Sequence, residues 1–173
     1  MKTNNVVIFL QFVTNYENLV RYGVKLASDL KKAALLSYTY NPISVPLVTP
    51  GTISARMDYT GETVEKMHAE SREKIERIIE MIQREEPGLH EIHYQLSEGF
   101  ERNIIQDLTN RRDVDMILTI NESGNIFTVS SSSNEIIKDS ICPVFIVPSD
   151  YKYKPIERIV YATDYHSEDF ATI

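Results

Sequence analysis

The sequence predicts an α/β protein: an open, doubly wound, five-stranded parallel sheet with helices on both faces. Two observations predict it. Five short runs rich in apolar and β-branched residues alternate with stretches in which apolar residues recur every three or four positions. The runs are also separated by segments long enough to hold a helix, and parallel strands need such crossover connections. Ligands of sheets of this kind bind beyond the carboxyl ends of the strands, where the strand order switches.

The first 40 residues give two strands and one helix. The continuous apolar run Val6–Leu10 is typical of a strand buried on both faces, and Ala33–Tyr40 is predicted as the second strand. The helix between them has one apolar face, made by Leu19, Val20, Gly23, Leu26, Ala27 and Leu30.

A long loop and a long helix come next. Residues 41–60 contain three prolines and a glycine, which favour a loop, and loops of this length are usually functional or mobile. The helix that follows is stopped by Pro87 and Gly88. Its apolar stripe is formed by Val64, Met67, Ser71, Ile75, Ile78 and Ile82.

The second half of the domain gives three strands and two short helices. The alternating stretch "HEIHYQLSEG" is the third strand, and "VDMILTI" and "PVFIVP" are the fourth and fifth. The short helices lie in "FERNIIQDLTNRRD", which carries Ile104, Ile105 and Leu108, and in "SSNEIIKDS".

Composition excludes several classes of function. The 173 residues carry a net charge of −7 with a pI near 5.1, which argues against a nucleic-acid surface and against binding to an anionic membrane. No apolar run approaches the roughly 18 residues of a membrane span, and the first residues are typical of a strand and not of a signal peptide. A single cysteine, Cys142, cannot form an internal disulfide, so nothing indicates an oxidising compartment. We expect a cytoplasmic protein.

A repeated pattern suggests a second domain. Val6–Asn18 and Ile159–Asp169 share an apolar strand, a polar residue, an aromatic residue and a polar helix start, at a constant offset of 153 that pairs Gln11 with Asp164. We therefore expect a first domain at 1–148, a linker at 149–154, and the truncated start of a second domain at 155–173.

The stretch "NESGNIFTVSSSSNEII", residues 121–137, lies where a phosphate loop would be placed, between the fourth strand and the next helix. Small residues and serine hydroxyls before a helix N-terminus can hold phosphate. The alternative is structural: the serines cap the helix and Gly124 lies in a turn.

No other constellation supports chemistry. His90 and His93 are three apart in a strand and would face opposite sides, so no metal site is predicted. Cys142 precedes Pro143 in an apolar run and is predicted to be a buried hydrophobe. There is no nucleophile elbow and no acid/base pair, so no catalytic residue is predicted.

Several segments together resemble the universal stress protein family. They are "VKLASDLKKAALLSYTY", "LSEGFERNIIQDLTNRRDVDMILT", which is similar to the family's "eG…I…DLIVMG", and "SSSNEIIKDSICPVFIVP", which is similar to its "GS…CPVLVVP". The resemblance covers residues 1–148. "RIVYATDYHSED" is similar to the family's opening strand, so the chain resembles the first half of a tandem stress protein. The resemblance implies a Rossmann-like fold of the adenine nucleotide alpha-hydrolase type.

The resemblance also implies where a nucleotide would bind. ATP-binding members carry Gly-x2-Gly-x9-Gly-(Ser/Thr) after the fourth strand and an aspartate after the first. Here Gln11 replaces the aspartate, the first two glycines fall near Ile120 and Ser123, and Ser130 replaces the last glycine. Ser131 keeps the hydroxyl, and the loop is about three residues shorter than usual. Ser123, Gly124, Ser130 and Ser131, with Gln11, are thus a degenerate nucleotide site for ATP or AMP, whereas Asp164 is the candidate in the second copy.

Three functions follow as alternatives. The resemblance favours a non-catalytic stress-response domain that forms a homodimer, or pairs with a second stress-protein domain, through the last strand, Val144, Phe145, Ile146 and Val147. The second is a nucleotide-binding stress protein with slow or no hydrolysis, and a weak ATPase belongs, if anywhere, to the complete tandem protein. The third is a small-molecule sensor or enzyme, with residues 41–60 as a lid and Tyr38, Tyr40 and Tyr59 as candidate pocket-lining residues.

Overall fold

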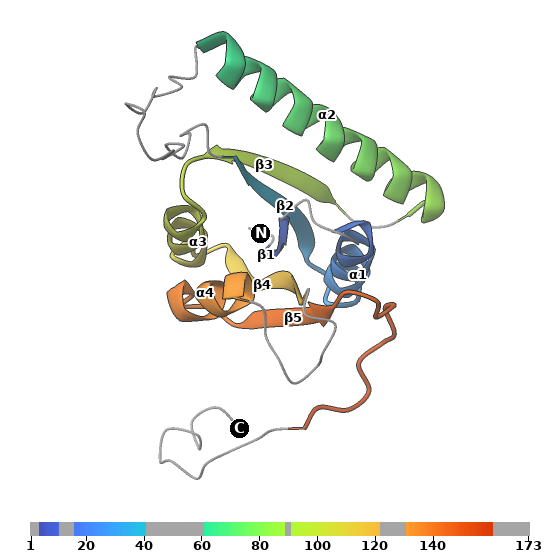
Figure 1. Cartoon of the computed structure of the whole chain (residues 1–173). Helices are drawn as coiled ribbons and strands as arrows, with labels where there is room; N and C mark the ends of the chain where they lie inside the picture. Colours follow the sequence, from blue (N-terminus) through green and yellow to red (C-terminus); the bar gives the residue numbers. More distant parts are fainter. Residues whose placement is uncertain (1–3, 11–15, 41–60, 89–90, 122–130, 161–173) are drawn as a thin grey trace.

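The computed structural model describes residues 4–10, 16–40, 61–88, 91–121 and 131–160, and in these ranges it contains one five-stranded parallel sheet (Figure 1). The strand order is β3-β2-β1-β4-β5, with the chain switching direction across the sheet between β1 and β4. All four strand pairs are parallel, so the predicted fold class is confirmed. The strands are β1 (Asn5–Leu10), β2 (Ala33–Tyr40), β3 (Ile92–Glu98), β4 (Val114–Asn121) and β5 (Val144–Pro148).

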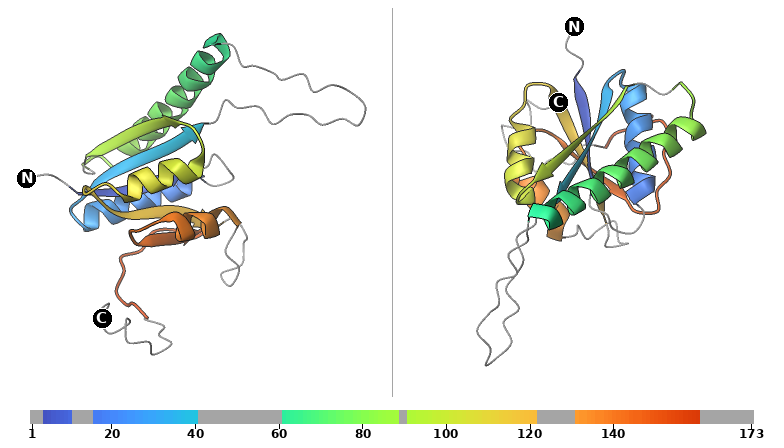
Figure 2. Two further views of the ribbon diagram at one scale, coloured as in Figure 1. Left: turned by 90° about the vertical axis from the view of Figure 1, so that its left-hand side faces the viewer. Right: turned by 90° about the horizontal axis from the view of Figure 1, so that it is seen from above.

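Four helices cover the two faces of the sheet (Figures 1 and 2). They are α1 (Tyr16–Asp29), α2 (Gly61–Glu85), α3 (Glu101–Thr109) and α4 (Ser131–Asp139). Alternate residues of β1 point to opposite faces, as the geometry of a strand requires. Val6 and Ile8 join the core under α1 and α2, whereas Val7 and Phe9 join the core under α3 and α4. All four side chains are at most 1% exposed, which explains the unbroken apolar run.

The predicted helix faces are confirmed except at their ends. Along α2, Ser71, Ile75, Ile78 and Ile82 are buried, and the Ser71 hydroxyl donates to the Met67 carbonyl at 2.7 Å. The prediction that Leu30 belongs to the buried face of α1 is wrong, because this side chain is 40% exposed. The helix ends at Asp29, and Lys31 adopts a left-handed conformation, with φ of 56°, that turns the chain into β2. Residues 41–60, predicted as a loop, lie outside the described residues.

Helix α1 approaches the sheet at Gly23, which has no side chain to hold the two apart. A Cβ atom built at this position would lie 2.5 Å from both Cδ1 and Cγ1 of Ile8, and 3.3 Å from Cδ2 of Leu118. Ile8 and Leu118 are fully buried, and side chains in such a core are closely packed. The glycine therefore sets how closely α1 lies on β1 and β4.

We expect Gly23→Ala to lower the free energy of unfolding by about 1–3 kcal/mol, the usual effect of overpacking a core, although alanine is intrinsically the better helix former. Urea unfolding would measure the loss. The substitution should be less harmful in an Ile8→Ala background, where the opposing atoms are absent. Equal losses in both backgrounds would contradict the steric explanation.

Candidate functional site

The carboxyl ends of β1 and β4 form the switch point of the sheet, where folds of this class place their ligands. Beyond β4, the chain enters α4 at Ser131, so the N-terminus of this helix faces the same end of the sheet. Such a terminus presents unpaired backbone N–H groups and can attract an anion. The connection between β4 and α4, residues 122–130, holds three of the predicted nucleotide-site residues and lies outside the described residues.

Of the residues predicted for the nucleotide site, only Ser131 lies in the described ranges, as the first residue of α4. Gln11, Ser123, Gly124 and Ser130 lie outside the described ranges, as does Asp164 of the proposed second copy. Ile120, which stands near the first family glycine, is a buried strand residue and 1% exposed. An isoleucine side chain is thus packed into the core near the position where the ATP-binding motif has a glycine.

One serine of the run has a structural role. Ser133 is fully buried, and its Oγ donates a hydrogen bond of 2.9 Å to the carbonyl oxygen of Ile120. The bond fastens the first turn of α4 to the end of β4 and satisfies a buried carbonyl. For Ser133 this supports the structural alternative, because a hydroxyl held in this way is directed at the protein backbone.

Sequence reasoning missed a set of buried hydroxyls on the face of the sheet that α3 and α4 cover. Ser37 and Thr39 on β2 and Thr119 on β4 are at most 8% exposed. Their hydroxyl oxygens have no hydrogen-bond partner within the described part of the chain. Polar side chains of this kind normally find a partner, protein or water. In the sequence, the serine and threonine that alternate with tyrosines in "SYTY" could have indicated polar side chains on one face of β2.

A surface cleft of about 430 Å³ opens beside Thr39, between the start of α3 and α4. Its other lining residues are Gly99, Phe100, Glu101, Arg102 and Glu135. Two of these are carboxylates, and the guanidinium of Arg102 is paired with Asp139 at 3.1 Å. The charge of the cleft is therefore unfavourable for a triphosphate.

The predicted pairing strand, β5, lies at one edge of the sheet. The Pro143 carbonyl accepts a bond of 3.0 Å from the amide of Ile117, so alternation directs the backbone of Phe145 and Val147 toward β4. The backbone N–H and C=O groups of Val144 and Ile146 consequently point away from the sheet. The side chains of Val144, Phe145 and Ile146 are half-buried, and Val147 is fully buried.

Apolar side chains continue the surface beside this edge. Ile137 on α4 is 42% exposed, and Ile141, in the turn before β5, is 73% exposed. The opposite edge of the sheet, β3, instead presents exposed His93 and Tyr94, and Glu91 precedes it. Edge strands are normally protected by such polar residues. The two edges therefore differ in chemical character.

The remaining predicted candidates offer no reactive group in the described ranges. Nε2 of His93 lies 3.1 Å from a carboxylate oxygen of Glu91 on the surface, and His90 is outside those ranges. Among the residues described, no three His, Cys, Asp or Glu side chains are grouped to hold a metal ion. Cys142 is half-buried against the apolar core, not fully buried as predicted, and burial raises the pKa of its thiol. A raised pKa disfavours the nucleophilic thiolate.

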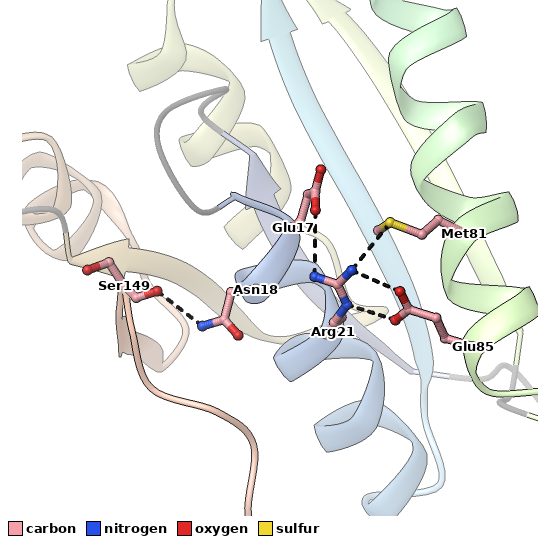
Figure 3. A network of polar contacts seen from close by, with 6 residues as sticks. All are labelled: Glu17, Asn18, Arg21, Met81, Glu85 and Ser149. Carbon is pink, nitrogen blue, oxygen red and sulfur yellow. Dashed lines mark hydrogen bonds and ion pairs between the residues drawn. The ribbon is translucent and has the colours of Figure 1, made fainter.

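A polar network joins α1 to its neighbours (Figure 3). The Arg21 guanidinium donates to both carboxylate oxygens of Glu85 on α2, at 2.8 and 2.9 Å, and to the sulfur of Met81 at 3.3 Å. The hydrogen bond from Arg21 lowers the pKa of Glu85, which keeps this carboxylate charged. The network ties two helices together and leaves no group available for chemistry.

Comparison with known proteins shows similarity in structure but not in sequence. No family model matches the chain, and no curated protein matches it. Solved structures of universal stress proteins do match. The UspA protein of Lactobacillus plantarum superimposes with a TM-score of 0.64 at 14% identity, over 85% of this chain and 99% of that one.

Two further matches are nucleotide complexes. A universal stress protein in complex with cAMP gives a TM-score of 0.56 at 15% identity, over 87% of this chain and all of that one. The universal stress protein of Archaeoglobus fulgidus in complex with dAMP gives 0.57 at 17% identity, over 84% and 98% of the two chains. At these identities the shared feature is the fold, which confirms the Rossmann-like architecture that the resemblance implied. Separately, no helix in the described ranges is long and apolar enough to cross a membrane.

We expect Ser133→Ala to lower the free energy of unfolding by about 1–3 kcal/mol, because it leaves the buried Ile120 carbonyl without its donor. Asn134→Ala, at the next and exposed position of α4, is the matched control and should change stability little. Chemical denaturation of the three proteins would measure both effects. A neutral Ser133→Ala would show that this bond does not hold α4 on the sheet.

Proposed function

We propose that this chain is a non-catalytic domain of the universal-stress-protein type that acts in stress response or regulation by pairing through β5. The partner is a second domain of the same kind, either in another copy of the chain or following in the same chain. The observation that carries the proposal is the contrast between the two edges of the sheet. The outward-pointing backbone groups of β5 belong to the half-buried Val144 and Ile146, whereas β3 carries the exposed His93, Tyr94 and Glu98.

Edge strands attract further strands because their outer N–H and C=O groups remain available. At β5 the outward groups belong to Val144 and Ile146, and the exposed Ile137 and Ile141 extend the apolar area toward α4. A strand added here would satisfy the backbone groups and cover these isoleucines. On β3, by contrast, an added strand would have to approach exposed charged and polar residues.

The repeated sequence supports a second domain of the same kind. At the offset of 153, Ile159 and Val160 correspond to Val6 and Val7 of the central strand β1. Val6 and Val7 are fully buried, whereas Ile159 and Val160 are 86% and 93% exposed. Side chains suited to the centre of a sheet are thus left uncovered after the first sheet, as expected if residues 155–173 begin a second one.

Nucleotide binding is the second candidate function, and the specific observation that favours it is the pair of similar structures solved with cAMP and dAMP. In this chain the phosphate loop lacks all three of the family's glycines, Ile120 is packed into the core, and the nearby cleft carries Glu101 and Glu135. We therefore favour pairing over nucleotide binding for this domain.

Ile146→Lys should convert a self-associating protein into a monomer, because it places a charge beside the outward backbone groups of β5. Sedimentation velocity over a range of protein concentrations would measure this. His93→Lys introduces the same charge on the β3 edge and should leave association unchanged. A wild-type chain that stays monomeric throughout, or equal effects of the two lysines, would contradict pairing through β5.

Titration calorimetry with ATP, AMP and cAMP separates the two candidate functions. We expect no saturable binding, which corresponds to Kd values weaker than about 1 mM. The Archaeoglobus fulgidus stress protein with dAMP serves as the positive control. Saturable binding of any of these nucleotides to this chain would support the nucleotide-binding alternative. It would not decide whether the chain pairs through β5, which the sedimentation experiment tests separately.

A further inference from the structure

Residues 149–153, which we call the strap, run back along α1 after β5 ends. The amide of Tyr151 donates to the Pro148 carbonyl at 3.0 Å, which closes a turn. Nδ2 of Asn18, in the first turn of α1, then donates to the carbonyls of Ser149 at 3.1 Å and of Tyr151 at 2.9 Å. Figure 3 shows Asn18 reaching Ser149 from the helix. The start of the strap is therefore held at the N-terminal end of α1.

Aromatic rings hold the middle of the strap. The ring of Tyr22, which is 4% exposed, lies 5.0 Å from the ring of Tyr153 in an edge-to-face arrangement. The same ring is 5.9 Å from Phe145 of β5 and 6.3 Å from Tyr151. These separations are those of attractive ring pairs. The strap thus covers the side of β5 that faces α1, and Tyr153 packs against the main apolar core.

The far end of the strap is fixed by a hydrogen bond from the Tyr153 hydroxyl to the Asp29 carboxylate. Burial of the ring, and then this carboxylate, raise the pKa of Tyr153, so the hydroxyl keeps its proton and remains a donor. Asn18 and Asp29 stand at opposite ends of α1, roughly 16 Å apart at 1.5 Å per residue. The strap is therefore hydrogen-bonded to both ends of α1 and packed against the Tyr22 ring between them, whereas a simple connecting segment needs none of these contacts.

We propose that the strap is an integral part of this domain that stays docked along α1, so that the chain becomes a free connector only after Tyr153. This goes beyond the proposed pairing, since it holds whether or not β5 has a partner. Residues 154–160 are all exposed and begin at the C-terminal end of α1. Whatever follows residue 160 is consequently tethered at a fixed point on the α1 side of the sheet. The predicted linker is shortened by the same inference to the residues after Tyr153.

Limited trypsin digestion of the whole chain tests this, because the tail carries one cleavable bond inside the strap and one outside it. The bond after Lys152 lies within the strap, the bond after Arg158 lies beyond it, and Pro155 blocks cleavage after Lys154. Mass spectrometry would give both rates, each divided by the rate in a synthetic peptide of residues 147–160. If the strap is docked, normalised cleavage at Lys152 should be about tenfold slower than at Arg158, or slower still. A tenfold ratio of docked to undocked strap corresponds to about 1.4 kcal/mol.

Three variants locate the cause of the protection. Tyr153→Phe removes only the hydroxyl that binds Asp29, Asn18→Ala removes the amide that holds Ser149 and Tyr151, and Tyr153→Ala removes the ring as well. Each should speed cleavage at Lys152 and leave Arg158 unchanged. Tyr94→Phe is the matched control, since its hydroxyl also binds a carboxylate, that of Glu76 at 3.1 Å, far from the strap.

Equal normalised rates at Lys152 and Arg158 in the wild-type chain would overturn the proposal. It would also be overturned if Tyr153→Phe and Asn18→Ala both left the protection of Lys152 intact. If Tyr153→Ala unfolds the chain, as circular dichroism would reveal, the other two variants still decide the question.

Discussion

The close contact between Gly23 of α1 and Ile8 of β1 is the constraint on which the rest of the structure depends. It brings the helix onto the sheet at a distance that no other residue allows. From this position Arg21 reaches Glu85 of α2 at 2.8 Å, and Lys25 reaches Glu86, just after the end of α2, at 2.6 Å. On its other side, the same helix receives the strap through Asn18, Tyr22 and Asp29. Helix α1 therefore connects the sheet, the longest helix and the segment that leaves the domain.

The carboxyl end of the sheet has the position of a ligand site, but the residues described there are engaged in internal contacts. A helix N-terminus can attract an anion, and Ser131 opens α4 at this end of the sheet. Yet Ser133 is turned toward the backbone of β4, Ile120 is part of the core, and carboxylates line the neighbouring cleft. These contacts stabilise the end of the sheet from within, and they are the reason that we propose an interface and not a phosphate site for this domain.

Much of the fold could be predicted from the sequence because its signals are local. Apolar patterns predicted the strands and helices that the structure describes, and the unbroken apolar run of β1 predicted its burial on both faces. Leu30 was assigned to the helix face because its spacing fits the apolar period. Periodicity does not show that α1 ends at Asp29 or that Lys31 takes a left-handed conformation. The strap could not be found in this way, since Tyr22 and Tyr153 are 131 positions apart and meet only in three dimensions. The nucleotide-site residues, Gln11 and Ser123 among them, lie outside the described ranges, so their prediction stands as made.

The unequal edges of the sheet have a consequence for assembly. A protein with two adhesive edges could add copies at both ends and grow into a filament. In the described ranges, the exposed His93, Tyr94 and Glu98 lie along β3, whereas the residues along β5 are apolar. Association through a single self-complementary edge is isologous and closes after two members. If the chain pairs through β5 as we propose, two sheets would join into one of ten strands, and the open edge would be satisfied without polymerisation.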